Sequence, residues 1–452
     1  MTVCVVGQGG REHALALALS RTTDVVVTPG NPGMVAPDGA FPGGYPIAVS
    51  AAAPEQIPAE LVVIGPEQPL VEGLADRLRA DGRQVFGPGA GGARLEGSKA
   101  FMKALLAEAR VPTARYGVFD EVAPAVAFLR SLPGPFVVKT DGLAAGKGVL
   151  VTDDLAEAEA DVAAKLSGGA FGDAGRTVVI EEGLRGAECS LLVVTDGTRV
   201  APLAPAQDFK RIGDGDHGPN TGGMGACSPV ALADDRLVDR VLDEAVEPTL
   251  AALRRRGIDY RGVLYAGLMV TDDGPFILEY NVRFGDPETQ VVLPRLDEDL
   301  AGLLAEAAAG RLRTDPRSRP DAAVCVVLAA EGYPGPVRTG DVIDGLDAVA
   351  ALPGVTAVHA GTAADAAGRI VTAGGRVLGI TATAPTLAVA RRLAYQGVAL
   401  VSWPGMQHRS DIARAAADAE AATGSPGAAP PAGAAHPAAG ARAGDAAPGE
   451  PR

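Results

Sequence analysis

Three polar side chains alternate along an apolar segment beyond the middle of the chain: Glu279, Asn281 and Arg283. Successive side chains of a β-strand point to opposite faces, so these three would share one face. Carboxylate and amide oxygens suit Mg²⁺, which can complete its coordination with water and phosphate. An arginine beside such a metal can stabilise a transferring phosphoryl group. The spacing predicts a metal and phosphate site; a solvated strand face is the alternative, which the apolar neighbours Ile277 and Leu278 disfavour.

A glycine-rich segment from Lys139 to Gly148 joins two predicted strands. It is not a Walker loop, because Gly142 and Gly146 enclose only three residues and a glycine follows Lys147. The pattern predicts a hairpin lid that could close over a triphosphate and exclude water. A flexible hairpin without a ligand is the alternative.

Lysine is rare here, since six of the 40 basic residues are lysines and the other 34 are arginines. We interpret the retained lysines as marking sites that need a compact ammonium, with chance retention as the alternative. All of them except Lys165 lie in segments singled out for possible chemistry: Lys99, Lys103, Lys139, Lys147 and Lys210.

Two turns could contact a nucleotide or a phosphate. The apolar run Val178–Leu184 ends in acids, and Glu188 follows, so its end could offer a carboxylate to ribose and backbone groups to adenine; a solvated strand end is the alternative. Near the N-terminus, the glycines of Gly7–Gly10 follow a strand and open a helix, which suits an anion. A dinucleotide site needs a glycine where Glu12 stands, so a single phosphate or a sugar phosphate is favoured over NAD, and an empty tight turn is the alternative.

A further loop begins at Gln207–Arg211 and continues to Gly225 with many glycines. Such a composition allows close approach of a ligand, or mobility. The specialised string Thr221–Gly225 favours a ligand over a bare surface loop. The histidines show no metal-ligand spacing, and we expect structural roles for His13, His217, His359 and His408.

The elements that must position these residues alternate between strand and helix patterns up to about residue 100. This alternation predicts a parallel sheet covered by helices, with ligands at the carboxyl ends of its strands. The predicted strands are Val3–Val6, Asp24–Thr28, Leu61–Ile64, Gln84–Phe86, Phe136–Lys139, Val149–Thr152, Gly262–Val270, Gly274–Tyr280 and Ala323–Ala329. The predicted helices are Glu12–Ser20, Val71–Ala80, Ser98–Ala109 with Ser98 as its cap, Asp154–Leu166, Leu237–Arg255 and Leu296–Ala309.

Length and charge limit the class of protein. A chain of 452 residues predicts two to four domains. A net charge of −15 disfavours nucleic-acid binding. No apolar run is long enough to cross a bilayer, the N-terminus lacks signal-peptide features, and the four cysteines form no CxxC pair, so we expect a cytoplasmic protein without structural zinc.

The segments Lys139–Gly148, Glu181–Glu188 and Glu279–Glu288 together resemble the ATP-grasp superfamily. Within it, the chain is similar from Val3 to about Ala417 to the phosphoribosylamine–glycine ligase family. The motifs that carry this second resemblance are Gly9–Ala14, Gly65–Glu67, Glu96–Phe101, Asp141–Gly148, Gly218–Ala226 and Arg283–Thr289.

The resemblance implies an α/β and α+β multidomain fold. Its parts are an N-terminal parallel α/β substrate domain (1–100), an ATP-grasp core of two lobes (101–320, lid lobe about 113–187) and a small C-terminal domain (321–420). A tail rich in Ala, Pro and Gly (421–452) lies outside the resemblance, and its composition predicts disorder.

The resemblance also implies a reaction, the second step of purine synthesis. ATP would phosphorylate the glycine carboxylate, and the amine of 5-phosphoribosylamine would attack the glycyl phosphate. The implied cofactors are ATP and Mg²⁺ or Mn²⁺, and we expect a monomer that binds neither nucleic acid nor membrane.

Site residues are carried over from the family motifs as expectations. The implied metal ligands are Glu279 and Asn281. The implied ATP contacts are Lys103, Lys139, Gly146, Lys147, Glu181, Glu182, Leu184 and Glu188. The implied substrate contacts are Gly9, Gly10, Glu67, Arg211 and Asp286, and the implied catalytic residues are Arg283, Lys210 and Asp208.

Phe209 departs from the family pattern, which usually has histidine there; if that residue touches substrate, glycine affinity or pH dependence would differ. Thr140 replaces a usual alanine and Tyr280 a usual phenylalanine. Three other functions stay open: another ATP-grasp ligase or carboxylase acting on a purine intermediate, a nucleotide-binding regulator without turnover, and a nicotinamide oxidoreductase.

Overall fold

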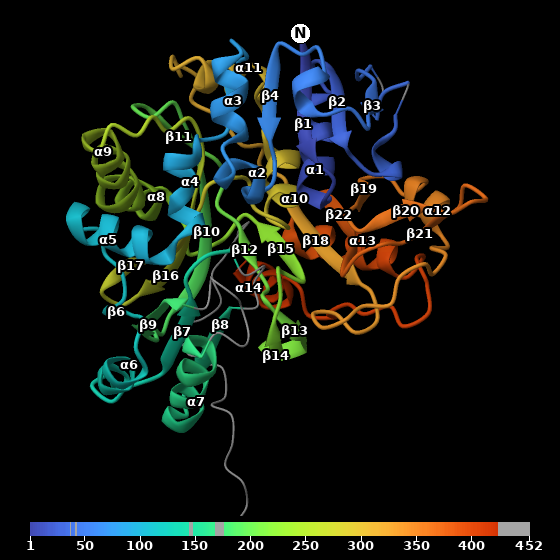
Figure 1. Ribbon diagram of the computed structural model, residues 1–452. Helices are drawn as coiled ribbons and strands as arrows, with labels where there is room; N and C mark the ends of the chain where they lie inside the picture. Colours follow the sequence, from blue (N-terminus) through green and yellow to red (C-terminus); the bar gives the residue numbers. More distant parts are fainter. Residues whose placement is uncertain (37, 41–42, 144–147, 168–175, 424–452) are drawn as a thin grey trace, which may run out of the picture.

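The computed structural model describes residues 1–423 apart from 37, 41–42, 144–147 and 168–175 (Figure 1). Among these residues, strands form two five-stranded, two four-stranded and two two-stranded sheets. Of the predicted tail 421–452, residues 421–423 end helix α14 (Arg414–Thr423), and the rest lies outside the described residues.

The N-terminal sheet is parallel throughout, as the sequence predicts. Its order is β3-β2-β1-β4-β5, and the ends of its central strands lead directly into helices. Every residue of β4 is buried, as expected for a strand covered on both faces. The strands are β1 (Thr2–Gly7), β2 (Asp24–Pro29), β3 (Ile47–Val49), β4 (Leu61–Ile64) and β5 (Val85–Phe86), and helix α1 (Gly10–Leu19) follows β1.

The single predicted helix Val71–Ala80 is wrong. Two helices occupy this region, α2 (Glu67–Val71) and α3 (Leu74–Ala80), and Gly73 separates them with a φ of +77°. This left-handed conformation interrupts a helix and favours glycine.

The capped helix predicted before residue 110 is confirmed. Helix α5 (Lys99–Ala109) follows α4 (Ala90–Gly97), and the Ser98 hydroxyl accepts a hydrogen bond from the Phe101 N–H at 3.1 Å. The cap satisfies one of the free N–H groups at the helix start.

One lobe projects at the lower edge of Figure 1, where α6 and α7 pack on the antiparallel sheet β6-β9-β7-β8. The predicted hairpin is present, since Lys139 of β7 pairs with Val149 of β8. The lobe has its own apolar cluster, which includes Leu129, Val162 and Ile180. Its elements are β6 (Tyr116–Phe119), α6 (Val122–Leu129), β7 (Phe136–Thr140), β8 (Val149–Thr152), α7 (Leu155–Leu166) and β9 (Val178–Glu182).

A second antiparallel sheet, the central sheet, has the strand order β11-β10-β16-β17. The predicted helix Leu237–Arg255 contains a π-helical turn, Leu242–Val246, between α8 (Asp235–Val241) and α9 (Glu247–Arg255). The strands are β10 (Ala187–Thr195), β11 (Val200–Pro202), β16 (Gly262–Thr271) and β17 (Gly274–Asn281).

The C-terminal sheet takes strands from two distant parts of the chain. Its order is β12-β15-β18-β22-β19, so β12 (Gln207–Asp208) and β15 (Gly225–Ser228) join strands that begin beyond residue 320. The remaining strands are β18 (Ala322–Ala329), β19 (Val355–His359) and β22 (Arg376–Ala384). Short hairpins and helices complete the region: β13 (Arg211–Gly213), β14 (His217–Asn220), β20 (Thr362–Ala364), β21 (Ile370–Thr372), α12 (Leu346–Ala350) and α13 (Leu387–Val398).

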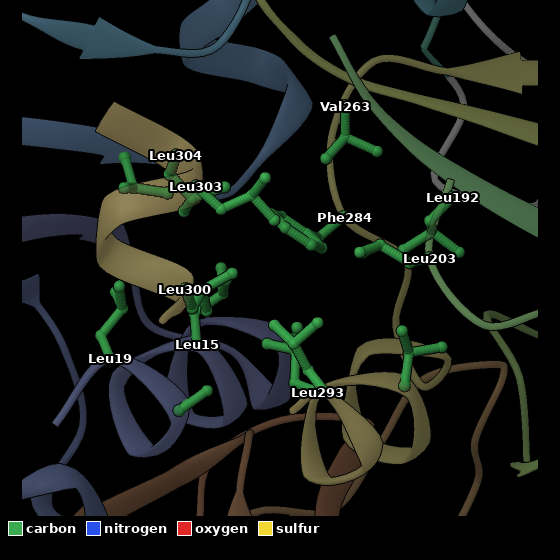
Figure 2. Packing of buried hydrophobic residues seen from close by; sticks show 14 of the residues in the cluster. Leu15, Leu19, Leu192, Leu203, Val263, Phe284, Leu293, Leu300, Leu303 and Leu304 are labelled. Carbon is green, nitrogen blue, oxygen red and sulfur yellow. The ribbon is translucent and has the colours of Figure 1, made fainter. Parts of the chain in front are cut away.

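One apolar cluster joins the N-terminal sheet to the centre. Figure 2 shows Leu15 and Leu19 of α1 near Leu300, Leu303 and Leu304 of α11 (Leu300–Ala308). The helix predicted at Leu296–Ala309 is α11, which starts four residues later, at Leu300. The shorter α10 (Thr289–Val292) precedes it. Burial of these side chains fixes the N-terminal sheet against the strands that carry the polar segment 279–288.

Two buried histidines connect the N-terminal and C-terminal sheets. The His359 N–H donates to Nδ1 of His13 at 2.8 Å, and burial lowers the pKa of His13 to about 3. Both histidines therefore have the structural role that the sequence predicts. No helix within the described residues is long and apolar enough to cross a membrane.

Candidate active site

A cavity of about 430 Å³ lies where the lobe hairpin, the central sheet and the C-terminal sheet meet. It brings together side chains from parts of the sequence more than 200 residues apart. The predicted site residues that line it are Glu67, Lys139, Asp208, Lys210, Glu279, Asn281, Arg283 and Asp286.

The predicted metal ligands lie together at the end of β17. Glu279, Tyr280 and Asn281 all line the cavity, and the buried Tyr280 places its hydroxyl 3.1 Å from that of Thr249. Burial would raise the pKa of Glu279, but Lys210 and Lys139 hold it below its usual value, so the carboxylate is ionised. An ionised carboxylate beside an amide oxygen fits a hard divalent cation.

Arg283 holds two acidic side chains at one wall of the cavity. Its Nη2 lies 2.7 Å from Oε1 of Glu96, and its Nε lies 3.2 Å from Oε2 of Glu67. Burial alone would lower the pKa of Arg283, but the two carboxylates raise it further above its usual range. Nη2 is also 3.5 Å from the amide oxygen of Asn281, so the arginine reaches one of the two candidate metal ligands.

Lys210 and Asp208 form an ion pair in a second wall of the cavity. The Lys210 Nζ lies 2.7 Å from Oδ1 of Asp208 and 3.2 Å from Oε2 of Glu188. Burial would lower the pKa of Lys210, but these carboxylates raise it well above its usual value. Glu188, the predicted ribose contact, is therefore connected to the cavity through Lys210, although it does not line it.

Lys139 joins the cavity to a buried ion pair. Its Nζ lies 2.7 Å from Oε1 of Glu181 and donates to the Leu278 carbonyl at 3.2 Å. The other Glu181 oxygen meets Lys103 at 2.7 Å, and both of these side chains are buried. Lys103 and Glu181 do not line the cavity, so their predicted contacts with ATP stay predictions.

The predicted adenine segment lies at the end of β9. Glu182 accepts a hydrogen bond from the Arg115 N–H at 2.9 Å, and Leu184 follows in the turn toward β10. Neither lines the cavity. Gly146 and Lys147, the predicted tip of the lid, lie outside the described residues.

The N-terminal glycine turn already holds a carboxylate. Oε2 of Glu12 accepts the Gly9 N–H at 2.7 Å, and a Cβ on Gly65 would lie 2.2 Å from Oε1. The side chain that argued against a dinucleotide thus occupies the helix start itself. Gly9 and Gly10 do not line the cavity, whereas the neighbouring Arg11 does.

Phe209 points away from the cavity, unlike its neighbours Asp208 and Lys210. Its ring packs on the apolar cluster of the C-terminal sheet, with the Arg409 guanidinium 5.2 Å from its centroid. The departure from the family pattern at this position therefore does not alter the cavity wall. Arg211 donates to the Gly218 carbonyl within the hairpin β13–β14 and does not line the cavity.

Sequence reasoning missed several lining residues. Lys99 donates to the Gly142 carbonyl at 3.0 Å and connects α5 to the hairpin. The Tyr265 hydroxyl donates to Glu288 at 2.9 Å, and burial, with Asp208 nearby, raises the pKa of Glu288 to about 7. Lys99 is one of the retained lysines, and Glu288 lies inside the family motif Arg283–Thr289, but the sequence assigns neither of them a particular role. No such signal marked Tyr265, Tyr333 or Arg376.

Among the described residues, no group of three or more His, Cys, Asp or Glu side chains could hold a metal ion. A cation at Glu279 and Asn281 would therefore take its other ligands from phosphate and water. That is the usual arrangement for Mg²⁺ beside a nucleotide.

Comparison with known proteins defines the class first. A model of the phosphoribosylglycinamide synthetase ATP-grasp (A) domain matches residues 97–289, which hold both metal candidates and the hairpin. The chain is thus an ATP-grasp protein. Models of the N domain and the C domain of the same family match residues 1–96 and 323–415. The chain belongs to the phosphoribosylglycinamide synthetase family.

Curated relatives agree over the whole length of the match. A phosphoribosylamine–glycine ligase of Streptomyces coelicolor is 51% identical over 435 residues, which are 93% of this chain and 100% of the relative. One of Brucella melitensis is 47% identical over 427 residues, with the same coverage. The resemblance predicted from the sequence, to a family of ATP-dependent ligases, is confirmed.

Solved structures support the predicted α/β and α+β multidomain fold. The crystal structure of a phosphoribosylamine–glycine ligase from Thermotoga maritima is 36% identical, with a TM-score of 0.78, and covers 91% of this chain and 100% of that one. A biotin carboxylase domain from Hydrogenobacter thermophilus is 17% identical, with a TM-score of 0.66 over 90% of this chain and 91% of that one, so it shows the fold alone. The predicted fold class is confirmed.

Proposed function

We propose that this protein ligates glycine to 5-phosphoribosylamine at the expense of ATP, giving glycinamide ribonucleotide, ADP and phosphate. The γ-phosphoryl group of ATP passes to a carboxylate oxygen of glycine. The amine nitrogen of 5-phosphoribosylamine then attacks the carbonyl carbon of the glycyl phosphate. The carbon–oxygen bond to phosphate breaks, and the attacking amine loses a proton. The observation that carries the proposal is the shared cavity of Glu279, Asn281, Lys139 and Arg283 in a chain of this family.

Glu279 and Asn281 would hold Mg²⁺ or Mn²⁺. When bound, the cation would neutralise charge on the phosphate oxygens. Lys139 would face the ATP phosphates from the base of the hairpin, and Lys147 from its tip. The other assigned ATP contacts remain those of the family motif: Lys103, Gly146, Glu181, Glu182, Leu184 and Glu188.

Arg283 would stabilise charge on the transferring phosphoryl group, since it reaches Asn281 while two carboxylates fix its guanidinium. Lys210 and Asp208 would approach glycine or the acyl phosphate. The phosphoribosylamine side would use Glu67 and Asp286, with Gly9, Gly10 and Arg211 as further family-based assignments. Positioning and charge stabilisation would supply the rate without a covalent protein nucleophile.

We also propose the organisation of the chain from the sequence: substrate domain 1–100, ATP-grasp core 101–320 with a lid lobe at about 113–187, C-terminal domain 321–420 and tail 421–452. A monomer in the cytoplasm accords with the proposal. Light scattering of the purified protein would test whether it is a monomer, and the mass of a dimer would refute that part of the proposal.

A turnover assay tests the function directly. The protein is incubated with ATP, Mg²⁺, glycine and freshly prepared 5-phosphoribosylamine, and both ADP and glycinamide ribonucleotide are measured. Equal amounts of both are expected. Bicarbonate or formate in place of glycine should give no ADP. ADP formation with bicarbonate but not with glycine would instead indicate a carboxylase.

A further inference from the structure

Arg376 enters the cavity wall from the C-terminal sheet. It is the first residue of β22, and its guanidinium contacts two separate parts of the wall. Nη2 lies 2.9 Å from Oδ2 of Asp286, and Nη1 donates to the Asp286 carbonyl at 2.6 Å. Nη1 also donates to the carbonyls of Gly222 and Gly223. One side chain therefore fixes the segment after β17 and the glycine-rich turn at the same time.

Asp286 is a junction of three parts of the chain. Its Oδ2 meets Arg376, and its Oδ1 accepts a hydrogen bond from the Gln290 amide at 2.7 Å. That amide packs against the N-terminal turn, since a Cβ built on Gly10 would lie 2.8 Å from it. The orientation of Asp286 thus depends on the N-terminal domain and the C-terminal domain together.

The glycine-rich turn has a second contact from the same side. The Gly222 N–H donates to the Tyr333 hydroxyl at 3.0 Å, and Tyr333 also lines the cavity. A Cβ on Gly222 would lie 3.0 Å from the Arg376 Cζ, so the turn passes directly against the guanidinium. Gly223 has a φ of +108°, which restricts this turn to a residue without a side chain.

We propose that Arg376 is a positioning residue through which the C-terminal domain sets Asp286 and the Gly222–Gly223 turn in the substrate half of the cavity. The inference rests on the proposed function, because that function places 5-phosphoribosylamine near Asp286 and ATP near Lys139. Arginine suits the role, since its planar fork can donate to a carboxylate and to carbonyls in fixed directions at once. Lysine could pair with Asp286 but could not hold the turn as well.

Arg376→Ala should raise the KM for 5-phosphoribosylamine about tenfold, the effect of losing a charge-assisted hydrogen bond. The KM for ATP should change less than about twofold. Arg376→Lys should recover only part of the loss, because it keeps the ion pair with Asp286 but not the contacts with the turn. Arg369→Ala is the matched control, since Arg369 is an exposed arginine of the same domain that pairs with Asp365.

A double-variant cycle tests whether Arg376 acts through Asp286. Adding Arg376→Ala to Asp286→Asn should cost less than adding it to the wild-type chain. Independent effects, equal KM increases for all substrates, or a lower Tm with unchanged KM would each overturn the inference. If the alanine variant does not fold, Arg376→Gln takes its place in every comparison. A wild-type chain that makes no product refutes the proposed function, whereas an active chain indifferent to Arg376 refutes the inference alone.

Discussion

The cavity is lined by two sets of cationic side chains, called its lysine end and its arginine end, which hold their positive charges in different ways. At the lysine end, single ammonium groups meet main-chain carbonyls or one or two nearby acids; this end comprises Lys99, Lys139 and Lys210. At the arginine end, each guanidinium contacts at least two partners, at least one of which is distant in the sequence; this end comprises Arg11, Arg283 and Arg376.

This contrast reflects what the two side chains can do. An ammonium is a compact charge that can exchange one oxygen for another, whereas a guanidinium fork is fixed by several hydrogen bonds. We interpret the lysine end as suited to phosphates that arrive and leave with each turnover. The arginine end suits a wall that is already formed before substrate binds.

Glu279→Gln is the largest test, because Glu279 lies among Lys99, Lys139, Lys210 and Arg283, between the two ends. Losing the proposed metal ligand should lower kcat/KM about a thousandfold, with the fold intact. ADP formation is measured against Mg²⁺ concentration, with the exposed Glu121→Gln as control. An unchanged rate would remove the metal from this position.

Glu288→Gln tests whether the Glu288 carboxyl, beside Asp208 and Lys210, keeps its proton up to about neutral pH. The folded pKa of Glu288, about 7, lies above its usual 4.5, so the folded state binds the proton more tightly. Its contribution to stability is full below about pH 4.5 and is lost as the pH rises to about 7. The glutamine side chain of the variant is neutral at every pH. The unfolding free energy of the variant, relative to that of the wild type, should therefore be about 3 kcal/mol higher at pH 8 than at pH 4.5. Urea unfolding at both pH values measures this gain, and parallel curves would contradict the assignment.

Arg283→Lys breaks the arginine end. Lysine keeps the charge but cannot meet Glu96 and Glu67 together in the present geometry. We expect about a thirtyfold loss of kcat/KM for glycine and 5-phosphoribosylamine, the magnitude of one charge-assisted hydrogen bond. Steady-state kinetics with each substrate varied in turn provides the measurement. Wild-type kinetics would mean that a point charge is sufficient there.

Lys139→Arg makes the opposite exchange and should have the smallest effect. The larger guanidinium has to fit a buried position against Glu181 and the Leu278 carbonyl. We expect about a tenfold rise in the KM for ATP, from overpacking, with little change for the other substrates. Arg185→Lys, at an exposed position, is the control. If the KM for 5-phosphoribosylamine rises instead, the division into two ends is wrong.

The sequence predicted much of the fold, because the decisive signals are local. The parallel N-terminal sheet follows from alternating apolar runs, and the Ser98 cap from a residue type at a helix start. Gly73 was harder, since a glycine within a helical pattern can be tolerated or, as here, take a positive φ. The two residues of β12 are too few to show any period.

The candidate site was predictable where its residues lie in one motif. Glu279 and Asn281 share one face of β17, and Arg283 lies two residues beyond the end of that strand, so local geometry is enough to bring the three together. Arg376 was not predictable, because its partners lie about 90 and 150 residues away and no local pattern records that contact. Glu12 shows the reverse case, in which a local pattern was noticed but its carboxylate proved to fill the turn itself.

The shared C-terminal sheet has a consequence for the order of folding. Strand β15 pairs on one side with β12, which carries Asp208, and on the other with β18, and the paired residues Gly225 and Val326 are about 100 residues apart in sequence. Such a non-local pairing forms late, because a long loop must close before the contact is made. During synthesis, a nascent chain that ends before Ala322 has no β18 against which β15 can pair. Since Arg376 also belongs to the wall, the site is completed only after more than four fifths of the 452-residue polypeptide has been made, so a truncated product would lack it.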